Sequence, residues 1–347
     1  MSKSRVNCSL TDAQRPLFVG VDVGGTNVKI GVVDDLGRTI AFQSIATEEE
    51  RGCEDAVSRI KDAIGGMLGD LTLSLDDVAT IGLATPGTMD IAKGMILTPP
   101  NLPHWRDYPI RDRLSELTGR PVAFSNDANA AAFGEFWIGT GRDYRSMIML
   151  TLGTGVGGGI IIDGMSIEGE HSFGSECGHI LIDHNETARL CVWGGGRGEL
   201  EAYCSASAVV QRTEEVLATG RESSLRARID GGQSLSSLMI AQEAEQGDAL
   251  AREIVLETGK YLGIGIVILV HTIDPGAVIL GGAMDFGGAD SELGQAFLAS
   301  VCQEFQERAF DVVRDETVIE FAQLGSDAGY IGAAGIAREA YSKTTPA

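Results

Sequence analysis

Two glycine-rich turns, each enclosed by apolar runs, constrain the fold of this 347-residue chain more than any other feature. The first begins at Phe18 and reads F-V-G-V-D-V-G-G-T-N-V-K-I-G-V-V, and the second reads M-I-M-L-T-L-G-T-G-V-G-G-G-I-I-I. Gly24 aligns with Gly153 at an offset of 129 residues, and at this offset Asp34 meets Asp163. Two strand–glycine–strand units in register predict an α/β protein of two related halves that face each other across a cleft.

The two glycine turns have a composition suited to phosphate binding. A pair of glycines can turn the chain with positive φ and present backbone N–H groups to an anion. Asp22 and Thr26 flank the first turn with groups that suit a metal-bound water or a phosphate. For the first turn taken alone, an ordinary hairpin within a β-meander is the alternative interpretation.

Between the two turns lies the segment S-N-D-A-N-A-A-A-F-G, Ser125–Gly134. It follows the apolar run Pro121–Phe124 and leads into an alanine-rich stretch, which predicts a strand, a polar elbow and a helix. Asp127 stands at the elbow, where the helix dipole and free N–H groups keep a carboxylate ionised. A simple helix cap is one interpretation of Asp127. A base between two phosphate-binding turns instead suggests phosphoryl transfer.

Other loops at strand ends are candidate binding elements. Val78–Ala84 reads as a buried strand that ends in T-P-G at Gly87, and ligands bind at such strand tips in open α/β sheets. Asn101 lies in the proline-rich segment L-T-P-P-N-L-P-H-W, which is either a hydroxyl-binding loop or a rigid connector. Ala277–Leu280 reads as a strand entering Gly281–Gly282, whose bare backbone suits a flat ring or ribose, or simply a turn into a helix.

Helical spacing and caps account for much of the remaining chain. We expect the chain beyond Ser205 to consist of helices around a single strand. Helices are predicted over 54–68, 109–118, 205–219, 248–271 and 327–341.

A stretch with glutamate, histidine and cysteine follows the second glycine turn. Glu176 and His179 are three residues apart, and such a pair is more often structural than functional. Cys177, His179, His184 and Cys191 can be assembled into a zinc site, but the paired cysteines of a structural zinc motif are absent. The six cysteines of the chain are scattered, so we expect free buried thiols instead of disulfides.

Charge restricts the class of partner. The net charge of −22 repels nucleic acid, anionic membrane and polyanions, which favours a small-molecule partner. The N-terminus has no apolar signal-peptide core, and the longest apolar stretch, Tyr261–Val270, is too short to span a bilayer. We therefore expect a cytoplasmic protein that binds neither nucleic acid nor membrane.

Taken together, these motifs resemble those of the ROK family (repressor, ORF, kinase), and in particular its glucokinase-like sugar kinases. V-D-V-G-G-T-N and L-G-T-G-V-G-G-G-I-I are similar to the two phosphate motifs of the family, and A-T-P-G is similar to its sugar-loop motif. S-N-D-A-N-A-A-A-F-G-E resembles the segment with the catalytic aspartate. E-C-G-H resembles the E-x-G-H element, and L-E-A-Y the segment with a further sugar-binding glutamate. The resemblance extends from about Phe18 to Ile336.

The resemblance implies a two-domain, actin-like ATPase fold of the ribonuclease H type, with ATP, Mg²⁺ and a sugar in the cleft. The implied domains are 16–124 plus 330–347, and 125–329. The implied reaction transfers a phosphoryl group from ATP to the primary hydroxyl of a hexose, glucose above all, with Asp127 as the general base. The implied sugar-binding residues are Gly87, Asn101, Asn126, Glu176, His179 and Glu201. The implied nucleotide-binding residues are Asp22, Gly24, Gly25, Thr26, Gly153, Thr154, Gly155, Gly281 and Gly282.

One segment departs from the family pattern. Members with a structural zinc have C-x-C-G-x-x-G-C after the histidine, whereas this chain has C-V-W-G-G-G-R-G-E. Cys191 is retained, but Trp193 and Glu199 stand near the other cysteine positions, and the glycine run is one residue longer. We therefore expect no bound zinc, for which His179 and Cys191 would be the candidate ligands. His179 would then be oriented by another contact, such as a hydrogen bond.

The family also includes sugar-responsive repressors with an N-terminal helix-turn-helix. About 17 residues precede the first predicted strand, too few for that module, and the acidic charge also disfavours DNA binding. Within catalysis, the alternatives are a kinase for N-acetylmannosamine, fructose or another hexose, and polyphosphate as the donor, which the acidity disfavours. The family leads us to expect a homo-oligomer, such as a dimer.

Overall fold

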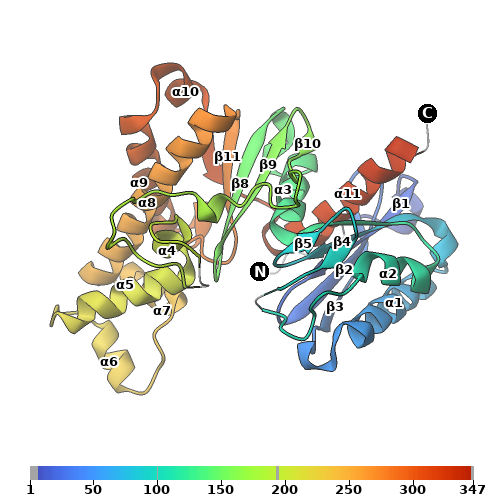
Figure 1. Ribbon diagram of the computed structural model, residues 1–347, viewed down its shortest axis with the longest axis horizontal. Helices are drawn as coiled ribbons and strands as arrows, with labels where there is room; N and C mark the ends of the chain where they lie inside the picture. The colour runs from blue at the N-terminus through green and yellow to red at the C-terminus, as the bar shows by residue number, and fades with distance from the viewer. Residues whose placement is uncertain (1–6, 100, 193–194, 345–347) are drawn as a thin grey trace. The chain divides into compact units, whose positions relative to one another are not determined.

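The computed structural model describes residues 7–99, 101–192 and 195–344. Contacts divide the chain into two compact units. The first contains the residues up to 143, together with 159–175 and the segment from 323 onward, and the second contains 144–158 and 176–322. Figure 1 shows helices and strands interleaved along the chain, as expected for an α/β protein.

The first sheet begins with a meander and continues with parallel strands. Its strand order is β3-β2-β1-β4-β7. The two hairpins β1–β2 and β2–β3 are antiparallel, whereas β4 runs parallel to both β1 and β7. The bounds are β1 Leu17–Val23, β2 Asn27–Val33, β3 Thr39–Ala46, β4 Val78–Thr85 and β7 Val122–Asn126.

The second sheet has the order β10-β9-β8-β11-β12, in which β11 runs parallel to both β8 and β12. Position by position, this order repeats that of the first sheet, with β8 in the place of β1. The repeat predicted from the two glycine turns is therefore confirmed in the strand order. The bounds are β8 Met147–Leu152, β9 Val156–Ile162, β10 Met165–Ser166, β11 Ala277–Gly281 and β12 Val318–Phe321. A separate two-stranded sheet pairs β5 Met89–Asp90 with β6 Met95–Ile96.

Helices cover both faces of the first sheet (Figure 1). The alternating residues Leu17, Val19 and Val21 of β1 pack in one core with residues of α1 Cys53–Asp70 and α2 Ile110–Thr118. On the opposite face Phe18 packs with Tyr330 of α11 Ala328–Thr344. Helix α3, Asp127–Trp137, packs beside α11.

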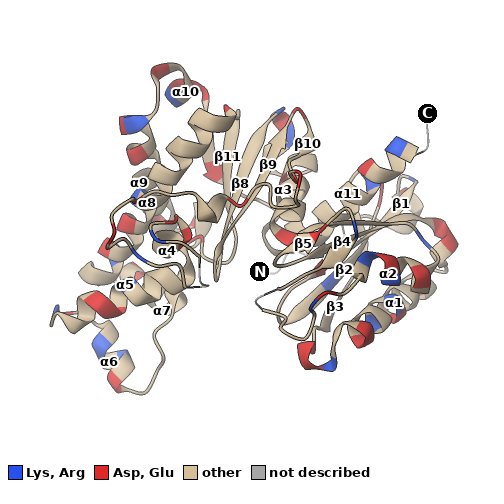
Figure 2. Ribbon diagram, viewed as in Figure 1, with Lys and Arg blue, Asp and Glu red and all other residues tan. Residues whose placement is uncertain are grey.

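The second unit contains most of the remaining helices. Two predicted starts are confirmed by their caps: Ser205 accepts a hydrogen bond from the N–H of Ala208, and Asp248 accepts one from Ala251. The bounds are α4 Glu201–Cys204, α5 Ala206–Ala218, α6 Leu225–Asp230, α7 Ser237–Glu245, α8 Ala249–Ile273, α9 Glu292–Arg308 and α10 Asp311–Glu316. Figure 2 shows β8 and β4 as ribbons without charged residues, whereas α1, α2 and α6 carry many.

The structure differs from the sequence expectations at a strand and at a domain boundary. The expectation of one strand beyond Ser205 is wrong, because Val318–Phe321 forms β12 beside β11. This strand is only four residues long and lies at the edge of the sheet, so it stands at the lower limit of length for a recognisable strand pattern. The contacts also group residues 125–143 with the first unit, where α3 packs on α11, whereas the predicted boundary lies before Ser125. The domain assignment stays a prediction.

Among the described residues, α8 is the one helix long and apolar enough to cross a membrane by length and composition. Most of its apolar window, 61%, is buried inside the structure. Helix α8 therefore has the environment of a core helix. All six cysteines are free, and all but Cys302 are buried, as expected from the sequence.

Candidate functional site

The carboxyl ends of three parallel strands meet at one edge of the first sheet. Asp22 near the end of β1 pairs with Ala84 of β4, and Thr85 at the end of β4 pairs with Asn126 at the end of β7. Because parallel strands end at a common edge, this register brings Asp22, the turn at Gly87 and the start of α3 to the same edge. The sequence-predicted residues of the first unit thus share one edge of the sheet.

Asp127 is the first residue of α3 and is partly buried. The cap of this helix is Asn126, whose Oδ1 accepts a hydrogen bond from the N–H of Ala128 at 2.8 Å. Oδ1 of Asp127 lies 2.9 Å from the same N–H. The interpretation of Asp127 as the helix cap is therefore wrong, because the capping position belongs to its neighbour.

Near Asp127 lie buried oxygen atoms that have no hydrogen-bond partner among the described residues. They are Oγ1 of Thr85, Oγ of Ser125 and Oδ1 of Asn129. These side chains are at most 3% exposed and come from the ends of β4 and β7 and the first turn of α3. A buried polar atom left unpaired costs about 1–3 kcal/mol. Such atoms at the end of a sheet indicate a place where water or a polar ligand completes the hydrogen bonds.

The first glycine turn is held by Thr47, which is fully buried. The hydroxyl of Thr47 donates to the carbonyl of Gly24 at 2.7 Å, and its N–H donates to the carbonyl of Thr26 at 2.9 Å. Neither Gly24 nor Gly25 has a positive φ, so the turn does not use the glycine conformation expected from the sequence. A Cβ at Gly25 would lie 3.7 Å from the Cβ of Asn101, an ordinary contact, so Asn101 lies beside this turn.

Asp22 lies against the start of α11. A Cβ added to Gly329 would stand 2.4 Å from Oδ2 of Asp22, so the carboxylate sits directly on the first turn of this helix. Burial raises the pKa of Asp22, and the positive charge of Lys29, its partner on β2, opposes that shift. The Nζ of Lys29 donates to the carbonyl of Ser326 at 2.7 Å. Asp22 is thus a carboxylate whose ionised form has little protein support.

In the second unit the glycine turn 153–155 lies beside the glycine pair 281–282. Gly281 at the end of β11 pairs with Thr151 of β8, immediately before Gly153–Gly155. Gly282 has a φ of +100°, and a Cβ there would lie 2.2 Å from the carbonyl oxygen of Leu152. The first residue of helix α5 holds the other turn, since the N–H of Ala206 donates to the carbonyl of Gly153 at 2.8 Å. The predicted nucleotide residues of this unit therefore lie on neighbouring stretches of backbone.

Glu201, the first residue of α4, is tied to this backbone. Its Oε2 accepts the N–H of Val156 at 2.8 Å, directly after Gly155, and its Oε1 accepts the thiol of Cys191 at 2.8 Å. The residue is 7% exposed. A side chain on Gly155 would collide with this carboxylate, since its Cβ would lie 2.4 Å from Oε2. The carboxylate of Glu201 therefore fixes the end of the second glycine turn.

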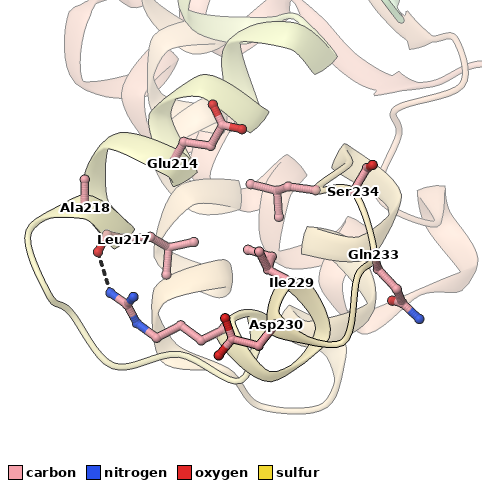
Figure 3. Close-up of a pocket in the computed structure, with 9 residues that line it drawn as sticks. Glu214, Leu217, Ala218, Ile229, Asp230, Gln233 and Ser234 are labelled. Atoms are coloured by element: carbon pink, nitrogen blue, oxygen red, sulfur yellow. Dashed lines mark hydrogen bonds between the residues drawn. The ribbon is translucent and has the colours of Figure 1, made fainter.

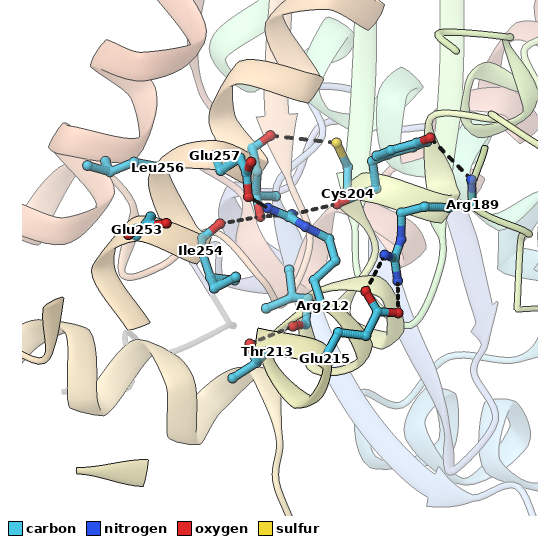
Figure 4. Close-up of polar contacts among 12 residues, drawn as sticks. Arg189, Cys204, Arg212, Thr213, Glu215, Glu253, Ile254, Leu256 and Glu257 are labelled. Carbon is cyan, nitrogen blue, oxygen red and sulfur yellow. Dashed lines mark hydrogen bonds and ion pairs between the residues drawn. The ribbon is translucent and has the colours of Figure 1, made fainter. Parts of the chain in front are cut away.

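A polar network holds α4 in place (Figure 4). The guanidinium of Arg212, which is buried, donates to the carbonyl of Tyr203 at 3.1 Å and to Oγ1 of Thr258 at 2.9 Å, and also pairs with Glu257. Arg212 stacks over the ring of Tyr261 at 5.1 Å. Because α4 carries Glu201, this network supports the position of the glycine turn indirectly.

His179 and Glu199 form a direct pair. Nδ1 of His179 lies 2.9 Å from Oε2 of Glu199, and Oε1 of Glu199 accepts the N–H of Gly196 at 2.7 Å. Burial would lower the pKa of His179, but the hydrogen bond with Glu199 and the charges of Glu199, Glu201 and Glu176 raise it overall. The predicted hydrogen bond that orients His179 is therefore present, and Glu199 provides it.

Glu176 stands at the exposed start of the same turn, where it precedes the 3₁₀ segment Cys177–His179. Partial removal of its carboxylate from water raises its pKa, the charge of His179 opposes this, and the charge of Glu201 adds to it. Within the second unit the structure thus brings Glu176, His179 and Glu201 close enough to influence one another's charge.

Comparison with known proteins decides the family. The family profile described as ROK family matches residues 18–340. The chain belongs to the ROK family. It is 34% identical to a glucokinase of Halalkalibacterium halodurans over 91% of this chain and 93% of that protein. It is also 28% identical to the xylose repressor of Bacillus subtilis over 92% of this chain and 76% of that protein.

Solved structures of this family share the fold. The ROK hexokinase from Thermus thermophilus superimposes with a TM-score of 0.77 at 30% identity, covering 94% of this chain and 99% of that one. A ROK glucokinase from Streptomyces griseus, solved in complex with glucose and AMPPNP, gives a TM-score of 0.75 at 32% identity, with 93% and 99% covered. This ROK protein therefore has the predicted actin-like ATPase fold, with two mixed five-stranded sheets.

The residues present do not fit the zinc implied for some family members. Ligand atoms of His179, Cys191 and Glu199 lie within 4.8 Å of one another. A structural zinc site takes four ligands, and in the described parts of the chain this group offers three. The thiol of Cys191 is already committed to Glu201, and both oxygens of Glu199 have partners. Trp193 lies outside the described residues. The group therefore does not make a closed structural zinc site.

A hollow elsewhere in the second unit carries none of the predicted residues. It has a volume of about 520 Å³ and lies between α5, α6 and residues 233–235. Figure 3 shows Leu217 and Ile229 facing its interior, with Glu214, Asp230 and Gln233 around it. The residues that line it come from outside the glycine turns.

Some site residues escaped sequence reasoning. Thr85, Ser125 and Asn129 sit inside recognised motifs, but their burial without partners appears only in three dimensions. Thr47 lies far from the first glycine turn in sequence and gives no signal of its own. Glu199 stood out only as a departure from a cysteine pattern. The clue in the sequence was a carboxylate near a position where the family pattern has cysteine, eight residues after Cys191 and two before Glu201.

Proposed function

We propose that this ROK protein is an ATP-dependent sugar kinase that phosphorylates the primary hydroxyl of a hexose, with glucose as the preferred substrate. Identities of 30% or more to glucokinases over most of the chain support the reaction class. The observation that carries the assignment of the base is the position of Asp127, which follows β7 at the edge where β1 and β4 also end. Asn126 occupies the cap position of this helix, and Oδ1 of Asp127 lies 2.9 Å from the N–H of Ala128 that the cap also accepts.

In the proposed reaction Asp127 accepts the proton of the attacking hydroxyl. General-base help of this kind contributes about 10² to 10⁴ in rate. The transition state of phosphoryl transfer is loose, so most of the remaining work is positioning and electrostatic stabilisation by backbone N–H groups. Thr26 and its neighbours would supply such groups in the first unit, and Gly153–Gly155 with Gly281–Gly282 would do so in the second.

A magnesium ion would neutralise charge on the phosphates of ATP. Asp22 fits that ion, because carboxylate oxygens are preferred ligands of Mg²⁺ and this carboxylate stands at the strand end beside the first glycine turn. Burial raises the pKa of Asp22, and a nearby cation would favour its ionised form.

The proposed sugar-binding residues supply amide, carboxylate and imidazole groups for hydroxyls. Asn101 borders the first glycine turn, and Glu176 and His179 share one short turn of the second unit. Glu201 already accepts one hydrogen bond on each oxygen, and each oxygen keeps a second lone pair for a hydroxyl. Gly87, at a φ of +84°, would let the backbone turn beneath the sugar.

The function is tested by measuring ADP release with ATP and Mg²⁺ against glucose, fructose, mannose, N-acetylmannosamine and glucosamine. Turnover that depends on glucose, with a product that glucose-6-phosphate dehydrogenase oxidises, supports the proposal. Turnover with another hexose alone would correct the substrate and keep the reaction class. Replacing ATP by polyphosphate tests the alternative donor, and light scattering tests the predicted dimer.

The similarity to xylose repressors favours one second candidate, a sugar-sensing protein without catalysis. Such a protein would bind hexose without releasing ADP. The net charge of −22 on this chain opposes DNA binding. Sugar binding by calorimetry with no ADP release above the buffer rate, together with a shift of operator DNA at physiological salt, would replace the kinase by this candidate.

A further inference from the structure

Residues 198–200 are joined to the segment 180–183 by backbone hydrogen bonds. The N–H of Leu200 donates to the carbonyl of Ile180 at 3.0 Å, and the N–H of Ile182 donates to the carbonyl of Gly198 at 2.8 Å. The N–H of Cys191 donates to the carbonyl of Gly196 at 3.2 Å. The first two bonds hold residues 198–200 against the segment 180–183, and the third ties Cys191 to Gly196.

Gly198 shows how closely the two segments approach. It has a φ of +76°, and a Cβ there would lie 1.7 Å from the carbonyl oxygen of Asp183. A position that combines positive φ with such a contact accepts only glycine. Two segments packed at this distance have little freedom to move. The backbone therefore holds Glu199, the residue after Gly198, beside His179.

The side chains then complete the arrangement. Oε1 of Glu199 is held by the N–H of Gly196, which leaves Oε2 to receive Nδ1 of His179 at 2.9 Å. The side chain of Glu199 is 13% exposed, whereas that of His179 is 43% exposed. The carboxylate is therefore the fixed member of the pair, and the imidazole is the member that still reaches solvent.

We propose that Glu199 takes the place of a metal ion in this protein, orienting the imidazole of His179 through Nδ1 so that no zinc is needed. Because a carboxylate only accepts hydrogen bonds, Nδ1 carries the proton and Nε2 is the nitrogen presented to a ligand. Glu199 is thus a positioning residue for His179. The effect on catalysis rests on the proposed kinase function, whereas the metal content and the proton position do not.

The metal content of the purified full-length protein tests the first half of the inference. We expect far less than one zinc per chain by plasma mass spectrometry, and a melting temperature that o-phenanthroline leaves unchanged. Close to one zinc per chain, or a melting temperature lowered by the chelator, would overturn the inference.

The proton position tests the second half. In ¹⁵N-labelled protein the two-bond spectrum of imidazole, with His179 assigned through His179→Gln, is expected to show a protonated Nδ1. The variant Glu199→Ala should lose this signature. Glu186→Ala removes an exposed carboxylate of the same region and serves as the control, with no expected change. An unchanged His179 spectrum in Glu199→Ala would contradict the role of Glu199.

Kinetics separate positioning from structure. Removing the partner that orients a functional histidine typically costs about 10- to 100-fold, so we expect a fall of that size in kcat/KM for hexose in Glu199→Ala, with partial recovery in Glu199→Gln. The KM for ATP should stay near the wild-type value. Equal losses for both substrates would indicate a structural defect and count against the inference. A wild-type protein without sugar turnover would reject the kinase function, while the metal and spectral results would still decide the role of Glu199.

Discussion

The carboxylate of Glu201 accepts the backbone N–H of Val156 at 2.8 Å, so a side chain of α4 fixes the main chain where the second glycine turn enters β9. This contact links two features of the sequence that lie 45 residues apart. A glycine turn binds an anion well only if its N–H groups are held in fixed directions. In this protein the buried carboxylate of Glu201 helps to hold the second glycine turn in this way.

Replacing Glu201 by alanine should affect stability and nucleotide binding together. The N–H of Val156 would lose its acceptor on Glu201, which costs about 1–3 kcal/mol of unfolding free energy. The KM for ATP should rise as well, because the turn is released. Urea unfolding and ADP release measure the two effects. Glu214→Ala, an exposed position on α5, is the control, and a Glu201→Ala protein of full stability would contradict the anchoring role.

Asp127→Asn tests the proposed base. The amide keeps the shape of the side chain but cannot take a proton, so kcat should fall by about 10² to 10⁴ while the KM for hexose changes little. Asp112→Asn, another aspartate in the first turn of a helix, is the matched control and should retain full turnover. Near-normal kcat in Asp127→Asn would remove Asp127 from the mechanism.

Much of the fold followed from the sequence because its signals are local. The glycine turns and the predicted helix starts at Ser205 and Asp248 depend on residues close in sequence, and the structure has both helix starts in place. The short edge strand β12 was missed because its four residues gain their structure from β11, not from their own pattern.

The site was harder to derive than the fold. The resemblance to family motifs indicated His179 and Glu201, but the partners that hold them, Glu199 and Val156, depend on how loops close on one another. The observed cap of α3 is Asn126, whereas the cap considered from the sequence was Asp127. The two positions are adjacent, and sequence patterns do not locate helix ends to a single residue. The expected positive φ at the first glycine pair failed for a related reason, since Thr47 shapes that turn from a distant part of the chain.

The buried Arg212 should be needed for the stability of the second unit. Arg212→Met removes donors to the carbonyl of Tyr203 and to Thr258, and we expect a loss of about 2 kcal/mol in unfolding free energy. Arg221→Met breaks an exposed pair with Glu253 and should cost less than about 1 kcal/mol. Chemical denaturation compares the two variants. Equal losses of unfolding free energy in the two variants would show that the buried contacts of Arg212 stabilise no more than an exposed ion pair.

The buried Asp34 should make the stability of the protein depend on pH in the acid range. Burial would raise the pKa of its carboxyl, but hydrogen bonds from Arg38 and from the N–H groups of Gln14, Arg38 and Leu36 lower it overall. A lowered pKa in the folded state means that the stabilisation is present above the ordinary aspartate pKa of 3.8 and is lost as the pH falls through the folded pKa. Asp34→Asn should therefore flatten the acid side of the stability curve measured by thermal unfolding. Asp62→Asn, an exposed position, should leave the curve unchanged.

Two glycines of the first unit should respond to alanine in opposite directions. A Cβ at Gly82 of β4 would lie 1.8 Å from the carbonyl oxygen of Ala333 in α11, so Gly82→Ala must push the helix away from the sheet. Overpacking of this kind costs about 1–3 kcal/mol or more, and here backbone is the obstacle, so we expect at least the upper figure. Gly66 lies inside α1, where an added methyl group would meet nothing within 4 Å, and Gly66→Ala should stabilise by about 0.5–1 kcal/mol because alanine favours the helix. Urea midpoints of both variants measure the difference. A stable Gly82→Ala protein would mean that α11 does not rest on β4 as closely as the carbonyl of Ala333 indicates.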